Sequence, residues 1–260
     1  MKVAVLGCGA IGGVVARGLK AGSIDGATLV GVVHNGDQDP PDLPVLDFAT
    51  AVERADLVVE CAGQRALAEL GTEVVRTGTD LLVVSIGAFA TPGLPERLES
   101  AGTGRVYLST GAIGGLDLLR AAALLGGLSH VGITTVKRAA SLSQDWMSEA
   151  ERDRLLTATE PVELMRGPAR DVTTRFPKSA NVAASVALAV GDWDLVEAAV
   201  IGDPDATLTS HIIEARGQAG QYRFEIRNAP SPQTPTTSQI TAYAVLRTIA
   251  DLAAGTAVFR

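Results

Sequence analysis

Over residues 1–112, short apolar runs alternate with stretches of helical spacing. Residues 3–6 form the first run and lead directly into glycines, and residues 66–76 show a clear helical pattern. Further apolar runs cover residues 28–33, 57–62, 81–86 and 106–108. Short runs rich in β-branched residues are typical of parallel strands buried on both faces. Strands that alternate with helices predict a parallel sheet with right-handed crossovers.

The pattern changes after residue 115, where apolar and polar positions alternate within the runs. Alternation predicts a sheet with one open face. A proline-rich connector then precedes Thr236, Thr237 and Ser238, which we expect to cap a final helix that runs through Leu252. The alternating runs cover residues 131–136, 162–165, 195–201, 211–215 and 222–226, and helical patterns cover 115–125 and 181–190.

These patterns predict an α/β protein, with a Rossmann-type doubly wound parallel sheet followed by a second, α+β domain. We place a dinucleotide-binding domain at residues 1–112 and the α+β domain at 113–232. Residues 233–260 are expected to form a C-terminal helix that returns to the first domain.

Composition narrows the class of protein. The 260 residues are 47% hydrophobic, and 22 Lys and Arg against 29 Asp and Glu give a net charge of −7. An acidic chain without a basic run is a poor binder of nucleic acid or membrane surfaces. The first apolar run is too short for a signal peptide, and two cysteines supply neither a disulfide framework nor a zinc site. We expect a cytoplasmic protein without a metal.

The first glycine segment, Gly7-x-Gly9-x-x-Gly12, follows a predicted strand and opens a predicted helix. This is the position of a dinucleotide fingerprint, so we expect NAD or NADP as cofactor. Gly7 would allow the tight turn, Gly9 the approach of the pyrophosphate, and Gly12 close packing of helix on strand. Ala10 and Ile11 complete the loop. The alternative is a tight strand-to-helix turn without a ligand.

The far end of the fingerprint differs from the usual pattern. An acidic residue is expected at the end of the second strand, about 20 residues on, to bind the ribose 2′-hydroxyl. His34 stands there, Asp37 lies three residues further on, and no arginine follows the strand directly. His34 could bind a hydroxyl or attract a phosphate, or it could be an ordinary loop histidine. The choice between NAD and NADP stays open.

Residues 111–115 repeat the sequence Gly-Ala-Ile-Gly-Gly of residues 9–13, again between an apolar run and a helical pattern. Both turns are expected at the carboxyl edges of strands, where ligands bind in α/β proteins. The second copy would hold the nicotinamide end or a substrate carboxylate, with Gly114 and Gly115 at the helix start. Close helix packing is the alternative.

Three side chains are candidates for the chemistry of the site. His211 lies where an irregular segment becomes a strand, and its ordinary pKa near 6.5 suits a proton acceptor in an oxidation by hydride transfer. Lys137 and Lys178 are candidate cations for an anionic substrate, although such side chains are more often solvated surface charges. Cys8 and Cys61 are expected to be small fillers.

Several segments together match one known family: residues 7–12, 58–62, 109–117, 176–184, 203–204, 228–232 and 235–238. On these segments the chain resembles the L-aspartate dehydrogenases over nearly its whole length. The resemblance implies a Rossmann domain with an α+β domain that builds a homodimer, with His211 as the catalytic histidine. It implies cofactor contacts at Ala112 and Asn181, and we count Cys61 with them.

The chain departs from the family pattern at His34, Ser179 and Thr209, where the family usually has an acidic residue and two asparagines. The resemblance implies NAD(P)-dependent oxidative deamination of L-aspartate, a dicarboxylate amino acid, to iminoaspartate, which water converts to oxaloacetate and ammonia, and the reverse. NAD biosynthesis is the implied context. Two alternatives stay open: a dehydrogenase of another amino or keto acid in a specialised pathway, and a regulatory protein that binds NAD(P)H without turnover.

Overall fold

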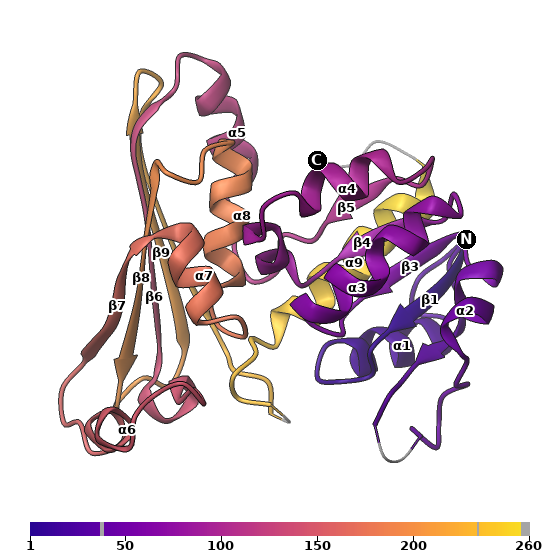
Figure 1. Ribbon diagram of the computed structural model, residues 1–260, viewed down its shortest axis with the longest axis horizontal. Helices are drawn as coiled ribbons and strands as arrows, with labels where there is room; N and C mark the ends of the chain where they lie inside the picture. The colour runs from indigo at the N-terminus through magenta and orange to yellow at the C-terminus, as the bar shows by residue number, and fades with distance from the viewer. Residues whose placement is uncertain (37–38, 233, 256–260) are drawn as a thin grey trace. The chain divides into compact units, whose positions relative to one another are not determined.

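The computed structural model describes residues 1–36, 39–232 and 234–255. Five parallel strands form a first sheet with the order β2-β1-β3-β4-β5 (Figure 1). The strand order reverses between β1 and β3, so their carboxyl ends border the crevice where α/β sheets bind ligands. The strands are β1 (Lys2–Leu6), β2 (Thr28–Val33), β3 (Leu57–Glu60), β4 (Asp80–Val83) and β5 (Val106–Leu108).

Helices cover both faces of this sheet. On one face α1 packs with the last helix, α9, whose Leu246 methyl groups lie 3.2 Å from the position of a Cβ at Gly18. On the other face Gly71 of α3 lets Leu98 of α4 and Leu81 of β4 approach closely. The helices of this unit are α1 (Gly12–Lys20), α2 (Phe48–Arg54), α3 (Gln64–Arg76), η1 (Ile86–Ala90), α4 (Leu94–Ser100) and α9 (Ile240–Ala254).

A second sheet of five strands has the order β10-β9-β6-β8-β7, in which the pair β6 and β8 is parallel and the other pairs are antiparallel. Its strands are β6 (Leu128–Arg138), β7 (Val162–Pro168), β8 (Val196–Asp203), β9 (Thr209–Gly217) and β10 (Gly220–Asn228). The accompanying helices are α5 (Leu116–Leu124), η2 (Ala139–Leu142), α6 (Glu149–Leu156), α7 (Ala169–Arg175) and α8 (Asn181–Val190).

The two faces of the second sheet differ. Val131, Ile133 and Ile213 point into a core shared with α5, α7 and α8. Residues on the opposite face alternate with them and are exposed or half-buried, as the burial of β9 and β10 shows. Figure 1 shows α7 and α8 on one side of these strands. The alternating sequence pattern has this physical origin: one face is packed and the other is open.

The predicted fold class is confirmed by the parallel sheet and the second, mixed sheet. The chain divides into two compact units, one of residues 1–111 with α9 and one of residues 112–240. The predicted limits 1–112, 113–232 and 233–260 stay a prediction; Gln233, residues 256–260 and Asp37 lie outside the described residues.

The expected caps of the last helix were wrong. Helix α9 begins at Ile240, while Ser238 forms an antiparallel bridge with Pro230. The backbone N–H of Ser231 donates to the carbonyl of Thr237 at 2.7 Å, and that of Gln239 donates to the carbonyl of Ala229 at 3.0 Å. The described residues of 229–239 therefore form a narrow hook before the helix, which we call the proline hook.

Candidate functional site

The glycine turn after β1 is closely packed at two of its three glycines. Gly7 has φ +93°, and a Cβ there would lie 2.7 Å from the Cα of Ala62. A Cβ at Gly12 would lie 1.9 Å from the carbonyl oxygen of Gly7. The backbone N–H of Gly7 also donates to the carbonyl of Val33, which fixes the turn to the end of β2. These glycines are required by the fold itself.

Gly9 is different, because a Cβ built there meets nothing within 4 Å. The protein leaves this space open above a turn that passes through Ala10 and Ile11 into α1, and no side chain caps that helix. The start of α1 thus presents backbone N–H groups and the positive end of the helix dipole. The open space at Gly9 fits a pyrophosphate, so the residues present suit a dinucleotide.

A buried carboxylate supports the turn from the neighbouring strand. Glu60 is the last residue of β3 and is 0% exposed. Its Oε1 accepts from the backbone N–H of Ala62 at 2.8 Å and of Gly63 at 2.9 Å, and from Ser85 Oγ at 2.9 Å; the backbone N–H of Ser85 donates to Oε2 at 3.0 Å. Burial raises the pKa of Glu60, and these hydrogen bonds oppose the shift. Glu60 therefore shapes the loop that packs on Gly7.

Sequence reasoning missed Glu60. The signal was present, since this carboxylate lies within the apolar run at residues 57–62, which was predicted to be buried on both faces. Such a group needs several hydrogen-bond donors, and the small residues that follow it provide backbone N–H groups.

Cys61 lies directly after Glu60 and is half-buried. Desolvation by burial, Glu60 and Cys8 all raise the pKa of the Cys61 thiol well above its ordinary value. Burial also raises the pKa of Cys8, although Arg17 opposes that shift. Thiols with raised pKa values stay protonated, so the structure favours neither cysteine as a nucleophile.

His34 follows β2 directly at the carboxyl edge of the sheet. Its Nε2 lies 2.4 Å from the position of a Cβ at Gly36, so the ring folds over its own loop. On the same loop, the carboxylate of Asp42 accepts from Arg17 Nε of α1 at 2.7 Å. The expected acidic alternative, Asp37, is not among the described residues.

The second glycine segment has a different geometry. Gly111 has φ +62° with open space around it, and its N–H donates to Ser109 Oγ at 3.1 Å. Gly115 has φ +80°, and a Cβ there would lie 2.7 Å from the ring of Phe224. Packing against that ring accounts for Gly115 without a ligand. A Cβ at Gly114 meets nothing within 4 Å, so Gly114 faces open space.

An amide side chain fixes this segment to the second sheet. Asn228, the last residue of β10, donates from Nδ2 to the carbonyl of Ala112 at 2.8 Å. Sequence reasoning gave Asn228 no role, because its partner lies 116 residues away in the chain. The contact places the loop of Ala112 and Gly114 at the end of the sheet where β10 ends.

Four polar side chains gather at that same end of the inner face. Thr135 pairs directly with His211 across β6 and β9. Lys137 lies two residues after Thr135 on β6, and Thr209 lies two residues before His211 on β9. All four are buried, with exposures of 3% for Thr135, 5% for Lys137, 5% for Thr209 and 2% for His211. We call these residues the His211 cluster. Side chains two positions apart on a strand share a face, which brings them together.

The cluster is polar but poorly solvated. Thr135 Oγ1 lies 3.1 Å from Nδ1 of His211, which leaves Nε2 as the free ring nitrogen. Desolvation by burial and the nearby charge of Lys137 lower the pKa of His211 to about 3. Burial also lowers the pKa of Lys137 to about 8. At neutral pH the cluster therefore holds a neutral imidazole beside an ammonium group.

Among the residues that the structure describes, Lys137 makes one hydrogen bond with its three donor hydrogens. Its Nζ donates to the carbonyl of Thr236, in the proline hook, at 2.8 Å. An ammonium group carries three N–H donors, so Lys137 retains capacity for an anion. Lys178, the other expected cation, is exposed.

The segment before α8 supplies a further buried polar atom. Ser179 is 5% exposed, and its Oγ is buried without a hydrogen-bond partner among the described residues. Asn181 begins α8. Because a short turn joins α8 to β8, the helix runs back along the sheet, and its first residues lie toward the end where β6 and β8 finish (Figure 1).

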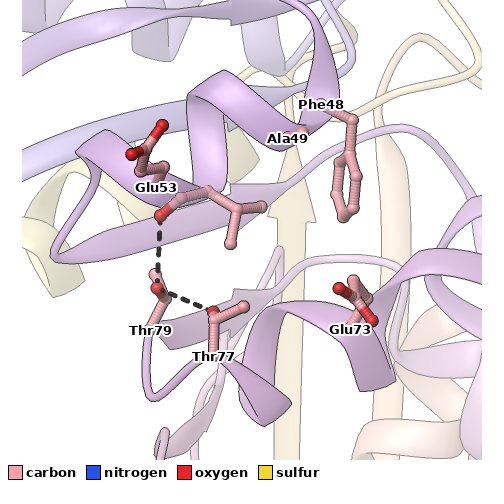
Figure 2. Close-up of a pocket in the computed structure, with 7 residues that line it drawn as sticks. Phe48, Ala49, Glu53, Glu73, Thr77 and Thr79 are labelled. Carbon is pink, nitrogen blue, oxygen red and sulfur yellow. Dashed lines mark hydrogen bonds between the residues drawn. The ribbon is translucent and has the colours of Figure 1, made fainter.

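A pocket of about 430 Å³ lies in the first unit. Phe48, Glu53 and Glu73 line it, and Figure 2 shows Thr79 bonded to Thr77 and to the carbonyl of Val52. Thr79 precedes β4, so the pocket lies at the amino end of that strand, opposite the edge that carries the glycine turn.

Among the described residues, no helix is long and apolar enough to cross a membrane.

Known proteins match both units. A family profile described as "Aspartate dehydrogenase, C-terminal" matches residues 117–252. A second, "Homoserine dehydrogenase, NAD binding domain", matches residues 7–105. An L-aspartate dehydrogenase of Methanopyrus kandleri is 34% identical over 98% of this chain and 97% of its own. One from Cupriavidus necator is 37% identical over 97% of this chain and 98% of its own.

Two solved structures are similar to this chain over its whole length. Aspartate dehydrogenase from Thermotoga maritima matches with a TM-score of 0.76 and 25% identity, covering 100% of this chain and 99% of that one. A hyperthermophilic archaeal homoserine dehydrogenase in complex with NADPH shares the fold, with a TM-score of 0.61, 11% identity and coverage of 100% and 99%. The resemblance predicted from the sequence is thereby confirmed: the chain belongs to the L-aspartate dehydrogenase family.

Proposed function

We propose that the protein catalyses NAD(P)-dependent oxidative deamination of L-aspartate to iminoaspartate, and the reverse reaction. Water then converts the imine to oxaloacetate and ammonia. The observation that carries the proposal is the buried pair of His211 and Lys137, a proton acceptor beside an anion receptor, within the region matched by the aspartate dehydrogenase profile. Amine oxidation of a dicarboxylate needs both groups.

The cofactor is NAD or NADP, consistent with the match to an NAD-binding profile over residues 7–105. Gly7, Gly9 and Gly12, with Ala10 and Ile11, would hold the pyrophosphate on the N-terminus of α1. When bound, the nicotinamide supplies a hydride acceptor. We further propose contacts from His34 near the adenosine ribose, and from Cys61, Ala112 and Asn181 toward the nicotinamide end.

His211 would accept a proton from the substrate amine at Nε2 as the Cα–H bond breaks. The low pKa of the free protein's His211 has two causes, burial and the positive charge of Lys137. A substrate carboxylate on Lys137 would neutralise that charge and so make His211 a stronger base when substrate is present. The site would thus couple proton acceptance to the binding of an anion.

Two anion receptors are needed for the two carboxylates of aspartate. We propose Lys137 for one, because its ammonium is buried and has spare donors. The open backbone at Gly114, near the start of α5, is our proposal for the other. Gly115 and Lys178 stay predictions with less support, since Gly115 packs on Phe224 and Lys178 is exposed.

We also propose that the protein is a cytoplasmic homodimer that supplies iminoaspartate for NAD biosynthesis. The open face of the second sheet supports the dimer, because Thr134, Val136, Ile201 and Ile212 are half-buried at its centre. Ion pairs such as Arg223 with Glu214 flank them. Sedimentation equilibrium at twice the chain mass would support this arrangement, and a monomer would contradict it.

A substrate panel tests the function. Absorbance at 340 nm would be followed with NAD or NADP and L-aspartate, D-aspartate, L-glutamate, L-asparagine, L-alanine or L-malate, and with NADH or NADPH, ammonia and the matching keto acids. We expect the highest kcat/KM with L-aspartate and oxaloacetate. A higher value with another acid would favour a specialised dehydrogenase. Cofactor binding with no turnover on any substrate would favour a regulatory protein.

A further inference from the structure

We propose that Thr135 is a positioning residue for His211: its hydroxyl accepts a hydrogen bond from Nδ1–H and so keeps Nε2 free as the basic nitrogen. The proposal rests on the proposed function, because it assigns the proton-accepting atom of that reaction. It adds a residue that neither the sequence motifs nor the fold alone single out.

The geometry of the pair carries the inference. Thr135 and His211 face each other as directly paired residues of β6 and β9, with Oγ1 3.1 Å from Nδ1. Both lie on the inner face of the sheet, with exposures of 3% and 2%, so water does not compete for the ring nitrogen. Two regular strands fix both backbones, and Thr135 has few χ1 rotamers as a β-branched residue. The contact is therefore held on rigid elements.

Proton balance decides the direction of the hydrogen bond. To accept a proton, His211 needs one nitrogen with a free lone pair, and the pairing with Thr135 leaves Nε2 for the substrate. The neutral ring must then carry its single proton on Nδ1, which donates to Thr135. Nε2 would take the proton of the amine nitrogen, and the electron pair of that N–H bond would form the C=N bond as the Cα–H bond breaks; a bound nicotinamide would supply the hydride acceptor. The Nδ1–H bond to Thr135 persists in the resulting imidazolium.

The charge near the His211 ring explains why a neutral hydroxyl, and not a carboxylate, is suited to orient it. Lys137 is the charged group that acts on His211 among the described residues, and it comes from the same strand as Thr135. A carboxylate at the position of Thr135 would form a competing partner for the Lys137 ammonium. A neutral hydroxyl orients the ring and leaves that ammonium for the substrate.

Three variants separate positioning from packing. Thr135→Val removes the hydroxyl and keeps the shape, and Thr135→Ser keeps the hydroxyl. Thr174→Val is the control, because it makes the same change at an exposed residue of α7, where the hydroxyl bonds the carbonyl of Arg170. For Thr135→Val we expect kcat with L-aspartate to fall about 10- to 100-fold, part of what loss of a general base costs. The affinity for NADH should not change. Thr135→Ser and Thr174→Val should stay within about threefold of the wild type.

Nitrogen-15 NMR of the histidine rings, assigned with His211→Gln, reads the tautomer without turnover. We expect the proton of His211 on Nδ1 in the wild type and redistributed in Thr135→Val. A proton on Nε2 in the wild type, or full kcat in Thr135→Val, would overturn the proposal. A wild type with the proton on Nδ1 but no aspartate turnover would instead overturn the proposed function.

Discussion

Residues 9–13 and residues 111–115 have the same sequence, yet they adopt different structures. In the first copy the helix begins at the fourth residue, Gly12, which touches the carbonyl of Gly7. In the second copy the helix begins after the fifth residue, Gly115, which has φ +80° and packs on Phe224. Five identical residues thus form a close strand-to-helix turn in one place and, in the other, a segment that ends in a left-handed glycine before the helix.

The difference shows that surroundings select among the conformations that glycine permits. In the first copy, β1 and Ala62 leave room for a tight turn and an open space at Gly9. In the second copy, Ser109 and Asn228 hold the segment by side-chain hydrogen bonds. A sequence motif therefore predicts a helix start at both places, and only the packing tells which glycines are closely packed and which face open space.

The largest expected effect is a difference in stability between alanine variants at the fourth residue of each copy, Gly12 and Gly114. Gly12→Ala would place a Cβ 1.9 Å from a backbone oxygen, so we expect a loss of about 3 kcal/mol or more in the free energy of unfolding. Gly114→Ala would place its Cβ in open space and should change stability by less than about 0.5 kcal/mol. Chemical denaturation of both variants measures this, and equal stabilities would contradict the contrast.

Gly9→Ala should separate binding from folding. The added methyl group meets no protein atom within 4 Å, so the melting temperature should stay at the wild-type value. If the pyrophosphate uses that space, affinity for NADH should fall about 100-fold, because a methyl group excludes the phosphate from the backbone N–H groups. Fluorescence titration with NADH tests this. Unchanged affinity would remove Gly9 from the site.

Alanine variants at the fifth residue of each copy, Gly13 and Gly115, should differ less in stability. Gly115→Ala forces a side chain to φ +80° against the Phe224 ring, and we expect it to cost about 2 kcal/mol of stability. Gly13→Ala meets the far end of the flexible Arg17 side chain inside α1, where alanine is the better helix former. We expect it to be neutral or slightly stabilising. Thermal unfolding compares them, and a tolerated Gly115→Ala would refute the packing role.

The smallest expected effect is the pH dependence of dicarboxylate binding at Lys137. Burial lowers the pKa of Lys137 to about 8, so in the free protein its positive charge is present below that pH and lost above it. Binding of succinate, a dicarboxylate without an amine, should weaken by up to about tenfold per pH unit above pH 8. Binding of NADH should show no such change. In Lys137→Met succinate should bind weakly at every pH, and a persistent slope in that variant would assign the titration to another group.

The parts of the molecule that follow from local pattern could be predicted. The strand-glycine-helix order around Gly7, the helix at residues 181–190 and the placement of His211 near a strand start all have local signals. The sequence alone did not distinguish Lys137 from Lys178 as the candidate cation for an anionic substrate. Only the three-dimensional structure shows that Lys137 is buried and acts on His211 while Lys178 is exposed.

Contacts between residues far apart in the chain could not be predicted from the sequence. Thr135 meets His211 across 76 residues, Asn228 meets Ala112 across 116, and Lys137 meets Thr236 across 99. The caps expected at residues 236–238 failed for the same reason, because Ser238 is paired with Pro230 in the proline hook. Capping residues form turns as readily as helix starts, and tertiary pairing chooses between them.

The central claim is that His211 performs the proton transfer while the glycine turn binds the cofactor. The most direct test measures L-aspartate turnover at 340 nm and NADH affinity in the wild type and in His211→Gln. We predict that kcat falls by about 100-fold or more in the variant while the dissociation constant of NADH stays the same. Turnover that survives in His211→Gln would contradict the account.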